Sequence, residues 1–406
     1  MTTNRRTLIV GGVMLLLGLV ALWLWRRQPD EPASVAVPVR VRPVPVAPRR
    51  EVPVTRSREI PASAPAVPVT NTPPANAADI YRKAIGMIVA LTDDEKKVLG
   101  DWKATVDPAM AVELCAKLQP IVALAHEAVA VTNCDWGVKN VGVETKLTYL
   151  NPARSLARAL VWHAAHCREG DATGAGDDLE ATLRIGQDSA QFLVGHHVNT
   201  AIEAMAIEYL AAHAGAFDAG ALERLAKLFG DDQYEKALYK AMEWEAEAVS
   251  QTADRFAAMA PEQIQQTLQQ LRGVNQFGLM DKAQLVAAVR QVVDLEREYV
   301  KAMDLPDAQY QAWLAKLHAM QTANPCVNMW WPTWNAAMDR TRAMVVQRAL
   351  VVAGLNVLTS GANALQQYPD PASGQPFVYR QTATGFELES AYQQKGKPVV
   401  LQFPKP

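Results

Sequence analysis

The stretch NPARSLARALVWHAAHCREGDATGAGDDLEATLRIG, residues 151–186, decides the fold. Asn151 before Pro152 is typical of a helix start, with a polar N-cap and a proline at the first helical position. Gly170 predicts the end of that helix, because glycine tolerates the left-handed backbone that follows many helices. The segment DATGAG then predicts a turn before a second helix. The stretch therefore predicts an antiparallel helical hairpin.

Apolar stripes extend this hairpin into a stack of three helices. Their spacings of three and four residues are those of amphipathic helices. The stripes are Leu156, Leu160, His163 and Cys167; Leu179, Leu183, Gly186, Ala190 and Leu193; and Val198, Ile202, Met205, Tyr209 and Ala212. Gly186 is small enough to let two helix backbones approach closely. We expect Asp177, Asp178 and Glu180 in the first turn of the second helix, where they complement its exposed amide dipoles.

The same pattern continues along the chain. Two capping boxes, Asp232 with Glu235 and Asp281 with Gln284, predict helix starts. Further helices are expected at 76–131 (two or three), 261–272, 306–321 and about 335–366. After Tyr368, turn residues separate short runs rich in Val, Phe and Tyr, which predicts an antiparallel hairpin and a third strand. We expect a mainly α body of antiparallel hairpins, solenoid or bundle, at 75–366 and a β tail at 367–406.

The beginning of the chain has a different composition. Residues 7–25, TLIVGGVMLLLGLVALWLW, carry no charge and are long enough to cross a bilayer. Flanking arginines and the pair Trp23 and Trp25 are typical of a membrane helix and its interfaces. We therefore expect residues 1–28 to form a cytoplasmic tail and a single uncleaved anchor in a bacterial inner membrane. A cleaved signal peptide is the alternative, but no small-x-small cleavage site follows the apolar run.

A proline-rich spacer separates this anchor from the body. Residues 29–74 contain 12 prolines, which predicts an extended tether without a packed core. Residues 1–60 carry ten arginines against four acidic residues, so the rest of this chain of net charge −2 is acidic. An acidic body excludes a nucleic-acid footprint.

The side of the membrane is predicted from two opposing signals. A short basic tail ahead of the first apolar helix favours export of the body to the periplasm. The count of flanking arginines leans the other way, because more of them follow the anchor than precede it. The four cysteines, Cys115, Cys134, Cys167 and Cys326, form no C-x-x-C motif, and export would allow one or two disulfides of unspecified pairing.

Several segments resemble known families. NCDWG at 133–137, CREGDATGAGDDLEATLRI, VGHHVNTAIEAMAIEYL, and DPASGQPFVYR followed by GFELES are similar to an uncharacterised family of membrane-anchored bacterial helical proteins, over residues 76–391. This resemblance implies an envelope location and the same helix order, with no established activity.

Two shorter resemblances concern local structure. Residues 159–190 are similar to one tetratricopeptide-type hairpin, because Gly170 and Ala175 have its five-residue spacing across the turn. The C-terminal tail resembles that of pseudopilin globular domains, which implies a terminal sheet. The chain departs from pseudopilins in its proline spacer and in lacking their acidic calcium-binding tail.

A metal site is one interpretation of the mid-chain histidines. His163, His166 and Glu169, at i, i+3 and i+6, lie on one helix ridge, and His196 or His197 would be the further donors. The chain has neither H-E-x-x-H nor Glu-x-x-His. Because His163 shares a stripe with leucines, we favour core packing and predict no metal and no cofactor.

Three other sites carry both a functional and a structural interpretation. Asp135 in the turn Cys134–Gly137 could act as a base, but we favour a turn cap beside a Trp136 that plugs the neighbouring hairpin. Glu245 could be a buried carboxylate, but a solvated rim position is favoured. A third site lies in NPCVNMWWPTW, in which three tryptophans form either a contact surface for glycan, lipid or protein, or a loop on the core: Trp330, Trp331 and Trp334.

The favoured function is a non-enzymatic binding or scaffold protein of the bacterial envelope. Its expected contacts are the inner membrane, through residues 7–25, and an unidentified envelope protein or glycan. A metal-dependent hydrolase that uses His163 and His166 is one alternative. An accessory component of a secretion or pilus-type system is another.

Overall fold

The computed structural model describes residues 75–142, 145–231, 233–270, 280–302 and 307–405. The expected anchor at 7–25, the spacer at 29–74 and the capping residue Asp232 lie outside these residues. The part of the chain from Ala75 onward folds as one unit.

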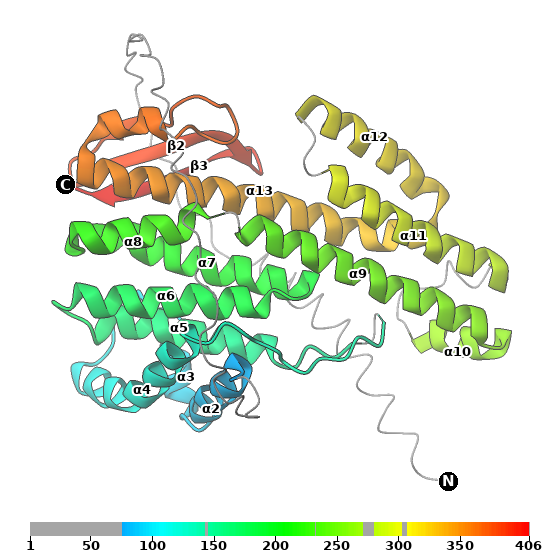
Figure 1. Ribbon diagram of the computed structural model, residues 1–406, viewed down its shortest axis with the longest axis horizontal. Helices are drawn as coiled ribbons and strands as arrows, with labels where there is room; N and C mark the ends of the chain where they lie inside the picture. Colours follow the sequence, from blue (N-terminus) through cyan, green and yellow to red (C-terminus); the bar gives the residue numbers. More distant parts are fainter. Residues whose placement is uncertain (1–74, 143–144, 232, 271–279, 303–306, 406) are drawn as a thin grey trace, which may run out of the picture. The chain divides into compact units, whose positions relative to one another are not determined.

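The described chain is mainly helical and ends in a small sheet (Figure 1). The helices are α2 (Ala77–Val89), α3 (Asp93–Val98), α4 (Pro108–Val129), α5 (Leu150–His166), α6 (Ala172–Ser189), α7 (Leu193–His213), α8 (Ala219–Gly230), α9 (Gln233–Ala258), α10 (Pro261–Gln270), α11 (Lys282–Ala302), α12 (Asp307–Ala323) and α13 (Pro325–Ser360), with 3-10 turns η1 (Ala214–Ala216) and η3 (Ala362–Gln367). The strands are β1 (Val378–Gln381), β2 (Gly385–Gln394) and β3 (Lys397–Pro404). This confirms the predicted mainly α class with a C-terminal antiparallel sheet.

The predicted three-helix stack is present as α5, α6 and α7, which lie side by side (Figure 1). A Cβ on Gly186 of α6 would lie 2.4 Å from Oδ1 of Asn199 on α7, so glycine permits the two helices to approach this closely without moving that side chain. On the other side, α2 and α4 pack against α5 and bury a shared apolar core. Gly170 has φ of +76°, which confirms the left-handed turn between α5 and α6.

Two predicted helix starts in the hairpin are wrong. α5 begins at Leu150, and its N-cap Tyr149 makes no side-chain capping bond, so Asn151 lies inside the first turn. α6 begins at Ala172 because the Asp171 carboxylate accepts a hydrogen bond from the backbone N–H of Gly174 at 2.9 Å. The acidic residues at 177, 178 and 180 therefore lie beyond the first turn of α6, and its predicted turn DATGAG is mostly helix.

Later helices follow the prediction more closely. The capping box at Asp281 and Gln284 is confirmed, because each side chain accepts from the other residue's backbone N–H at 2.8 and 3.0 Å. α13 starts ten residues earlier than expected, since Asn324 caps it and Pro325 occupies its first turn. Its 36 residues therefore include the tryptophan segment, which is helical and not a loop.

The sheet has the order β1-β2-β3, with antiparallel neighbours. It packs on α13 and α7, and Gly354 of α13 leaves room for the Phe403 ring of β3. Asp370 accepts hydrogen bonds from Oγ of Ser390 at 2.9 Å and the backbone N–H of Ala391 at 2.8 Å. The two segments that resemble the pseudopilin tail, DPASG and GFELES, are therefore bound to each other.

Two described helices are long and apolar enough to cross a membrane by length and composition, α4 and the part of α13 from Ala336 to Ser360. The second is largely a core helix, because it packs against α7, α8, β2 and β3.

Candidate functional site

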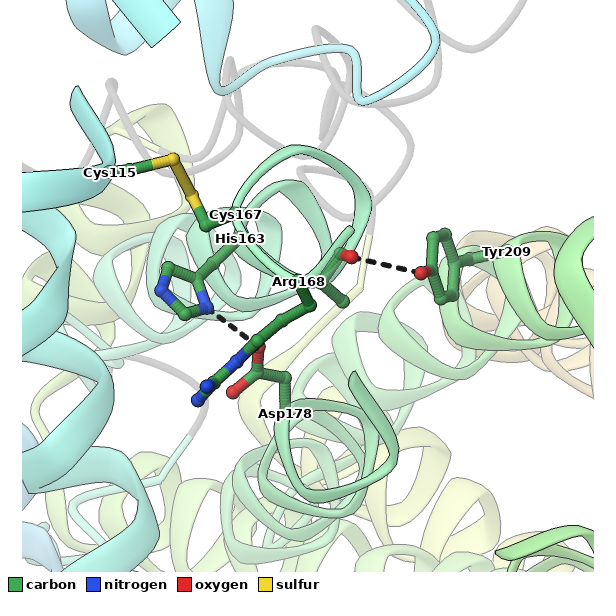
Figure 2. Close-up of a disulfide and its surroundings, with 7 residues drawn as sticks. Cys115, His163, Cys167, Arg168, Asp178 and Tyr209 are labelled. Atoms are coloured by element: carbon green, nitrogen blue, oxygen red, sulfur yellow. Dashed lines mark hydrogen bonds and ion pairs between the residues drawn. A yellow bond between two sulfur atoms is a disulfide. The ribbon is translucent and has the colours of Figure 1, made fainter. Parts of the chain in front are cut away.

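A disulfide joins the outer layer of helices to the central hairpin. Cys115 lies in the middle of α4, and Cys167 is the C-cap residue of α5 (Figure 2). Their Cα atoms are 5.6 Å apart, within the range that a disulfide spans. The other two cysteines, Cys134 and Cys326, are free thiols. The bridge closes a loop of 52 residues, and the spacing of the cysteines in the sequence does not specify this pairing.

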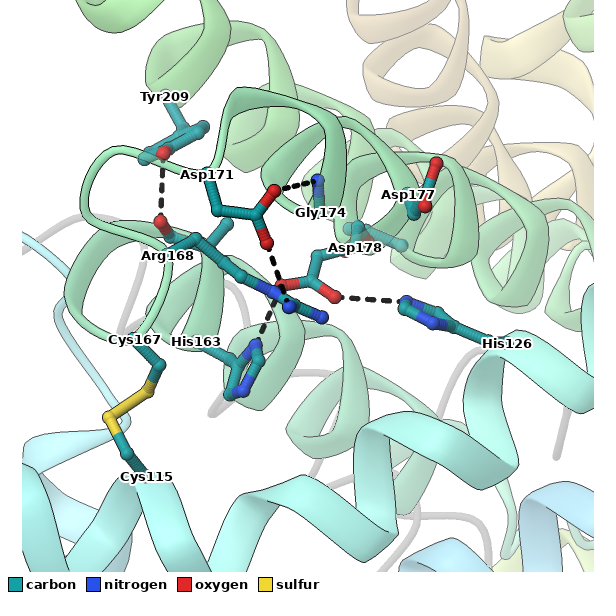
Figure 3. Close-up of polar contacts among 12 residues, drawn as sticks. Cys115, His126, His163, Cys167, Arg168, Asp171, Gly174, Asp177, Asp178 and Tyr209 are labelled. Carbon is teal, nitrogen blue, oxygen red and sulfur yellow. Dashed lines mark hydrogen bonds and ion pairs between the residues drawn. A yellow bond between two sulfur atoms is a disulfide. The ribbon is translucent and has the colours of Figure 1, made fainter.

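One carboxylate next to this bridge gathers side chains from three helices. Asp178 of α6 is fully buried and accepts a hydrogen bond from Nδ1 of His163 on α5 at 2.7 Å (Figure 3). Its second oxygen pairs with Nε2 of His126 on α4 at 2.9 Å. Arg168, just after α5, lies 3.4 Å away through Nε and also bonds Asp171 at 3.0 Å. We call His126, His163, Arg168 and Asp178 the Asp178 cluster.

The negative charge of Asp178 is matched by hydrogen-bond donors within the Asp178 cluster. Burial alone would raise the pKa of the Asp178 carboxyl, but hydrogen bonds from His126 and His163 hold that pKa below its ordinary value. Both carboxylate oxygens have donors, and His126 is the member with a partly exposed ring, at 31%. The carboxylate therefore stays ionised at neutral pH. Its contacts with His126, His163 and Arg168 stabilise the packing of α6 against α4 and α5.

The histidines of the predicted metal ridge have separate partners. Nε2 of His166 lies 2.9 Å from the backbone carbonyl of Trp102, and Glu169 is exposed. His196 is buried in another part of the body, where its Nε2 lies 3.3 Å from Oγ1 of Thr341. Among the described residues, no three His, Cys, Asp or Glu side chains converge in a way that could hold a metal ion.

The Cys-Asp-Trp-Gly turn has the structural roles that its sequence favours. The Asp135 carboxylate accepts from the backbone N–H of Gly137 at 2.7 Å, which caps the turn. Trp136 is buried and stacks on Tyr149, with ring centroids 4.6 Å apart, and its indole N–H donates to the carbonyl of Asp188 at 2.9 Å. Gly137 has φ of +66° and completes the turn.

A buried polar row on α7 was not predicted from the apolar stripes. Four polar side chains spaced at i, i+3, i+4 and i+7 are buried beside the predicted apolar stripe, of which Ile202 and Tyr209 are also buried: His196, Asn199, Thr200 and Glu203. Arg348 of α13 pairs with Glu203 at 2.7 Å and with Asp231 at 2.9 Å. The helical spacing of these polar residues was a usable signal, but their partner lies 145 residues away.

Two carboxyl groups lie close together between α9 and α11. Glu296 of α11 is fully buried, and neither carboxyl oxygen has a hydrogen-bond partner among the described residues. Burial and the neighbouring Glu245 raise the pKa of Glu296. Glu245 of α9 is half-buried, not solvated, and burial raises its pKa to about 7. Trp334 of α13 is fully buried beside this pair, whereas the side chains of Trp330 and Trp331 lie outside the described part.

Comparison with known proteins identified no relative of this chain. No protein-family model, no curated protein and no solved structure matches the chain.

Proposed function

We propose that the chain is a membrane-anchored scaffold or binding protein of the bacterial cell envelope, with its body on the periplasmic side and without catalytic activity. The Cys115–Cys167 disulfide carries this proposal. Structural disulfides persist in oxidising compartments such as the periplasm and are rare in the bacterial cytosol. The apolar run at 7–25 supplies the anchor, and the spacer at 29–74 has a reach on the order of 100 Å.

The use of the titratable side chains supports a non-catalytic body. Asp178 is occupied by His126, His163 and Arg168, and Glu203 by Arg348. These carboxylates hold neighbouring helices together, and their oxygens are already bound to other side chains and not to a substrate. The expected contacts of the body are therefore an envelope protein or a glycan, bound at its surface.

Location is tested with two independent readouts on the full chain. An alkaline phosphatase reporter fused after Pro406 should be active, because that enzyme needs oxidising conditions. Peptide mapping without reduction should recover Cys115 linked to Cys167, with Cys134 free. An inactive reporter together with four reduced thiols would place the body in the cytoplasm and overturn the proposal.

The scaffold role is tested by crosslinking in intact cells. A bound envelope protein or glycan should be recovered with the full chain and lost when the body is deleted after Pro74. Recovery of the chain alone under every crosslinker would count against the scaffold role without affecting the location.

A metal-dependent hydrolase that uses His163 and His166 remains the alternative from another class. Elemental analysis of the purified chain separates the two. His166→Ala is the informative variant, because the His166 ring lies outside the Asp178 cluster. A stoichiometric metal that is lost in this variant would favour the hydrolase.

An accessory role in a secretion or pilus-type system is a second proposal. The binding of DPASG to GFELES through Asp370 and Ser390 favours it, because these segments carry the resemblance to pseudopilins. Purification of the chain with components of such a system would support the role. Secretion unaffected by deletion of the chain would count against it.

A further inference from the structure

Two arginines on α5 differ from the other buried arginines of the body. Arg154 and Arg158 are half-buried, and the Nε atom of each is buried without a hydrogen-bond partner among the described residues. Neither Arg154 nor Arg158 forms an ion pair with any described residue. A guanidinium keeps its charge in proteins, so burial cannot be relieved by loss of a proton.

Other arginines of the body show how such a charge is normally matched. Arg348 is 5% exposed and contacts the carboxylates of Glu203 and Asp231. Arg184 of α6, also partly buried, pairs with Asp188 at 3.1 Å. Each has an anionic partner that offsets the cost of leaving water. The α5 pair has no such partner among the described residues.

The two guanidinium groups also repel each other. Burial and the charge of Arg158 lower the pKa of Arg154, and burial lowers the pKa of Arg158. Residues four apart on a helix have Cβ atoms about 5–6 Å apart, so both charges act on the same region of space. Two unmatched positive charges at this spacing fit one ligand with two negative oxygens.

We propose that Arg154 and Arg158 form a binding site for a phosphate group. Inorganic phosphate and phosphate monoesters carry close to two negative charges, a phosphodiester headgroup carries one, and the planar fork of arginine bonds two oxygens of either at once. A carbonyl or hydroxyl ligand would leave both positive charges unmatched. The phosphate group belongs either to a free phosphate compound or to a lipid headgroup, and both sources present two negatively charged oxygens.

The test measures the thermal unfolding of the full chain in neutral detergent and phosphate-free buffer. Inorganic phosphate or dihexanoyl phosphatidylglycerol should raise Tm in a saturable way, while chloride at equal ionic strength should not. In Arg154→Gln and Arg158→Gln, phosphate should bind at least about tenfold more weakly, since each variant removes a charge-assisted pair of hydrogen bonds. Arg297→Gln, a variant of an exposed arginine on α11, is the matched control and should respond like the wild type.

A second readout separates ligand binding from a structural role. Without phosphate, Arg154→Gln and Arg158→Gln should raise Tm, because each removes a desolvated and repelled charge. If these arginines served the fold, the same changes would lower Tm. Arg154→Lys should give an intermediate phosphate response, because it keeps the charge and loses the planar fork.

The source of the phosphate is distinguished with short-chain lipids below their micelle concentration. If Tm rises with dihexanoyl phosphatidylglycerol and not with the zwitterionic phosphatidylcholine or inorganic phosphate, the ligand is a lipid headgroup. If inorganic phosphate suffices, the ligand is soluble. The proposal is overturned if no phosphate compound raises Tm, or if the double variant Arg154→Gln/Arg158→Gln responds like the wild type.

Discussion

Asp178 accepts a hydrogen bond from Nδ1 of His163 at 2.7 Å, and both side chains are shielded from solvent. The same carboxylate holds His126, so α6 is tied to α4 and α5 at one point. The disulfide Cys115–Cys167 joins α4 to the end of α5 close by (Figures 2 and 3). The Asp178 cluster therefore joins three helices, and the covalent bond joins two of the same three.

Asp178→Asn should lower the free energy of unfolding by about 3 kcal/mol, because it leaves His163 and Arg168 without their buried anion. Asp177→Asn is the matched control, since Asp177 pairs with Arg224 on the surface and should change stability by less than about 1 kcal/mol. Urea unfolding at neutral pH measures both. Equal losses in the two variants would contradict the role assigned to the Asp178 cluster.

Acid should remove the stabilisation that Asp178 provides. The folded pKa of this carboxyl lies below its ordinary value, so its contribution is present at neutral pH and is lost as pH falls below about 4. The difference in unfolding free energy between wild type and Asp178→Asn should therefore shrink between about pH 5 and 3. A difference that stays constant over this range would contradict the pKa direction.

Reduction of the disulfide should lower the free energy of unfolding by up to about 4 kcal/mol, the chain-entropy value for a loop of 52 residues. Cys115→Ser should remove the sensitivity to reductant, whereas Cys134→Ser should keep it, because Cys134 is a free thiol. Urea unfolding with and without dithiothreitol gives the comparison. The assigned pairing is wrong if Cys134→Ser abolishes the effect of the reductant.

Glu245 and Glu296 should make the body less stable at alkaline pH. Their folded pKa values are raised, to about 7 for Glu245, so their contribution is complete below about pH 4 and is lost as pH rises above that value, for Glu245 through about 7. Glu296→Gln should therefore raise Tm relative to wild type increasingly as pH rises above about 4. Glu243→Gln, an exposed change on α9, should follow the wild-type curve at every pH. Parallel curves for Glu296→Gln and wild type would contradict the shifted pKa values.

Gly186→Ala should destabilise the body by about 1–3 kcal/mol, because the new methyl group would meet Asn199 and Ile202 of α7. Gly86→Ala is the opposite case, since Gly86 lies in an exposed part of α2 with open space around it. Alanine favours a helix over glycine by about 1 kcal/mol, so this variant should be more stable than wild type. Thermal unfolding that shifts both variants in the same direction would argue against the close approach of α6 and α7.

Local signals in the sequence were sufficient for most helices and for the sheet. Gly170, the capping box at Asp281 and the turn-separated strands after Tyr368 each depend on neighbours a few residues away, and the structure confirms them. The close helix contact at Gly186 was predictable, because a glycine on an apolar helix stripe is typical of a position where a second helix approaches closely. The predicted start of α6 was wrong because another residue caps the helix: Asp171 is the N-cap, several residues before the acidic run.

The contacts that define the interior depend on residues far apart in sequence. Arg348 and Glu203 are separated by 145 residues, and neither position shows from its neighbours that it is buried. Cys115 could be assigned to Cys167 only once α4 was placed beside α5. The polar row on α7 has a helical spacing, but so does the apolar stripe beside it, and the sequence did not show that both rows are buried.

The length of α13 has a mechanical consequence. Near one end, the carbonyl of Trp334 accepts a hydrogen bond from Tyr299 of α11, and toward the other, Gly354 receives the Phe403 ring of the sheet. The two positions are roughly 30 Å apart along a continuous helix. Between them Arg348 bonds Glu203 of α7 and the carbonyl of Leu228 on α8, so one continuous element links α11, the central helices and the terminal strands.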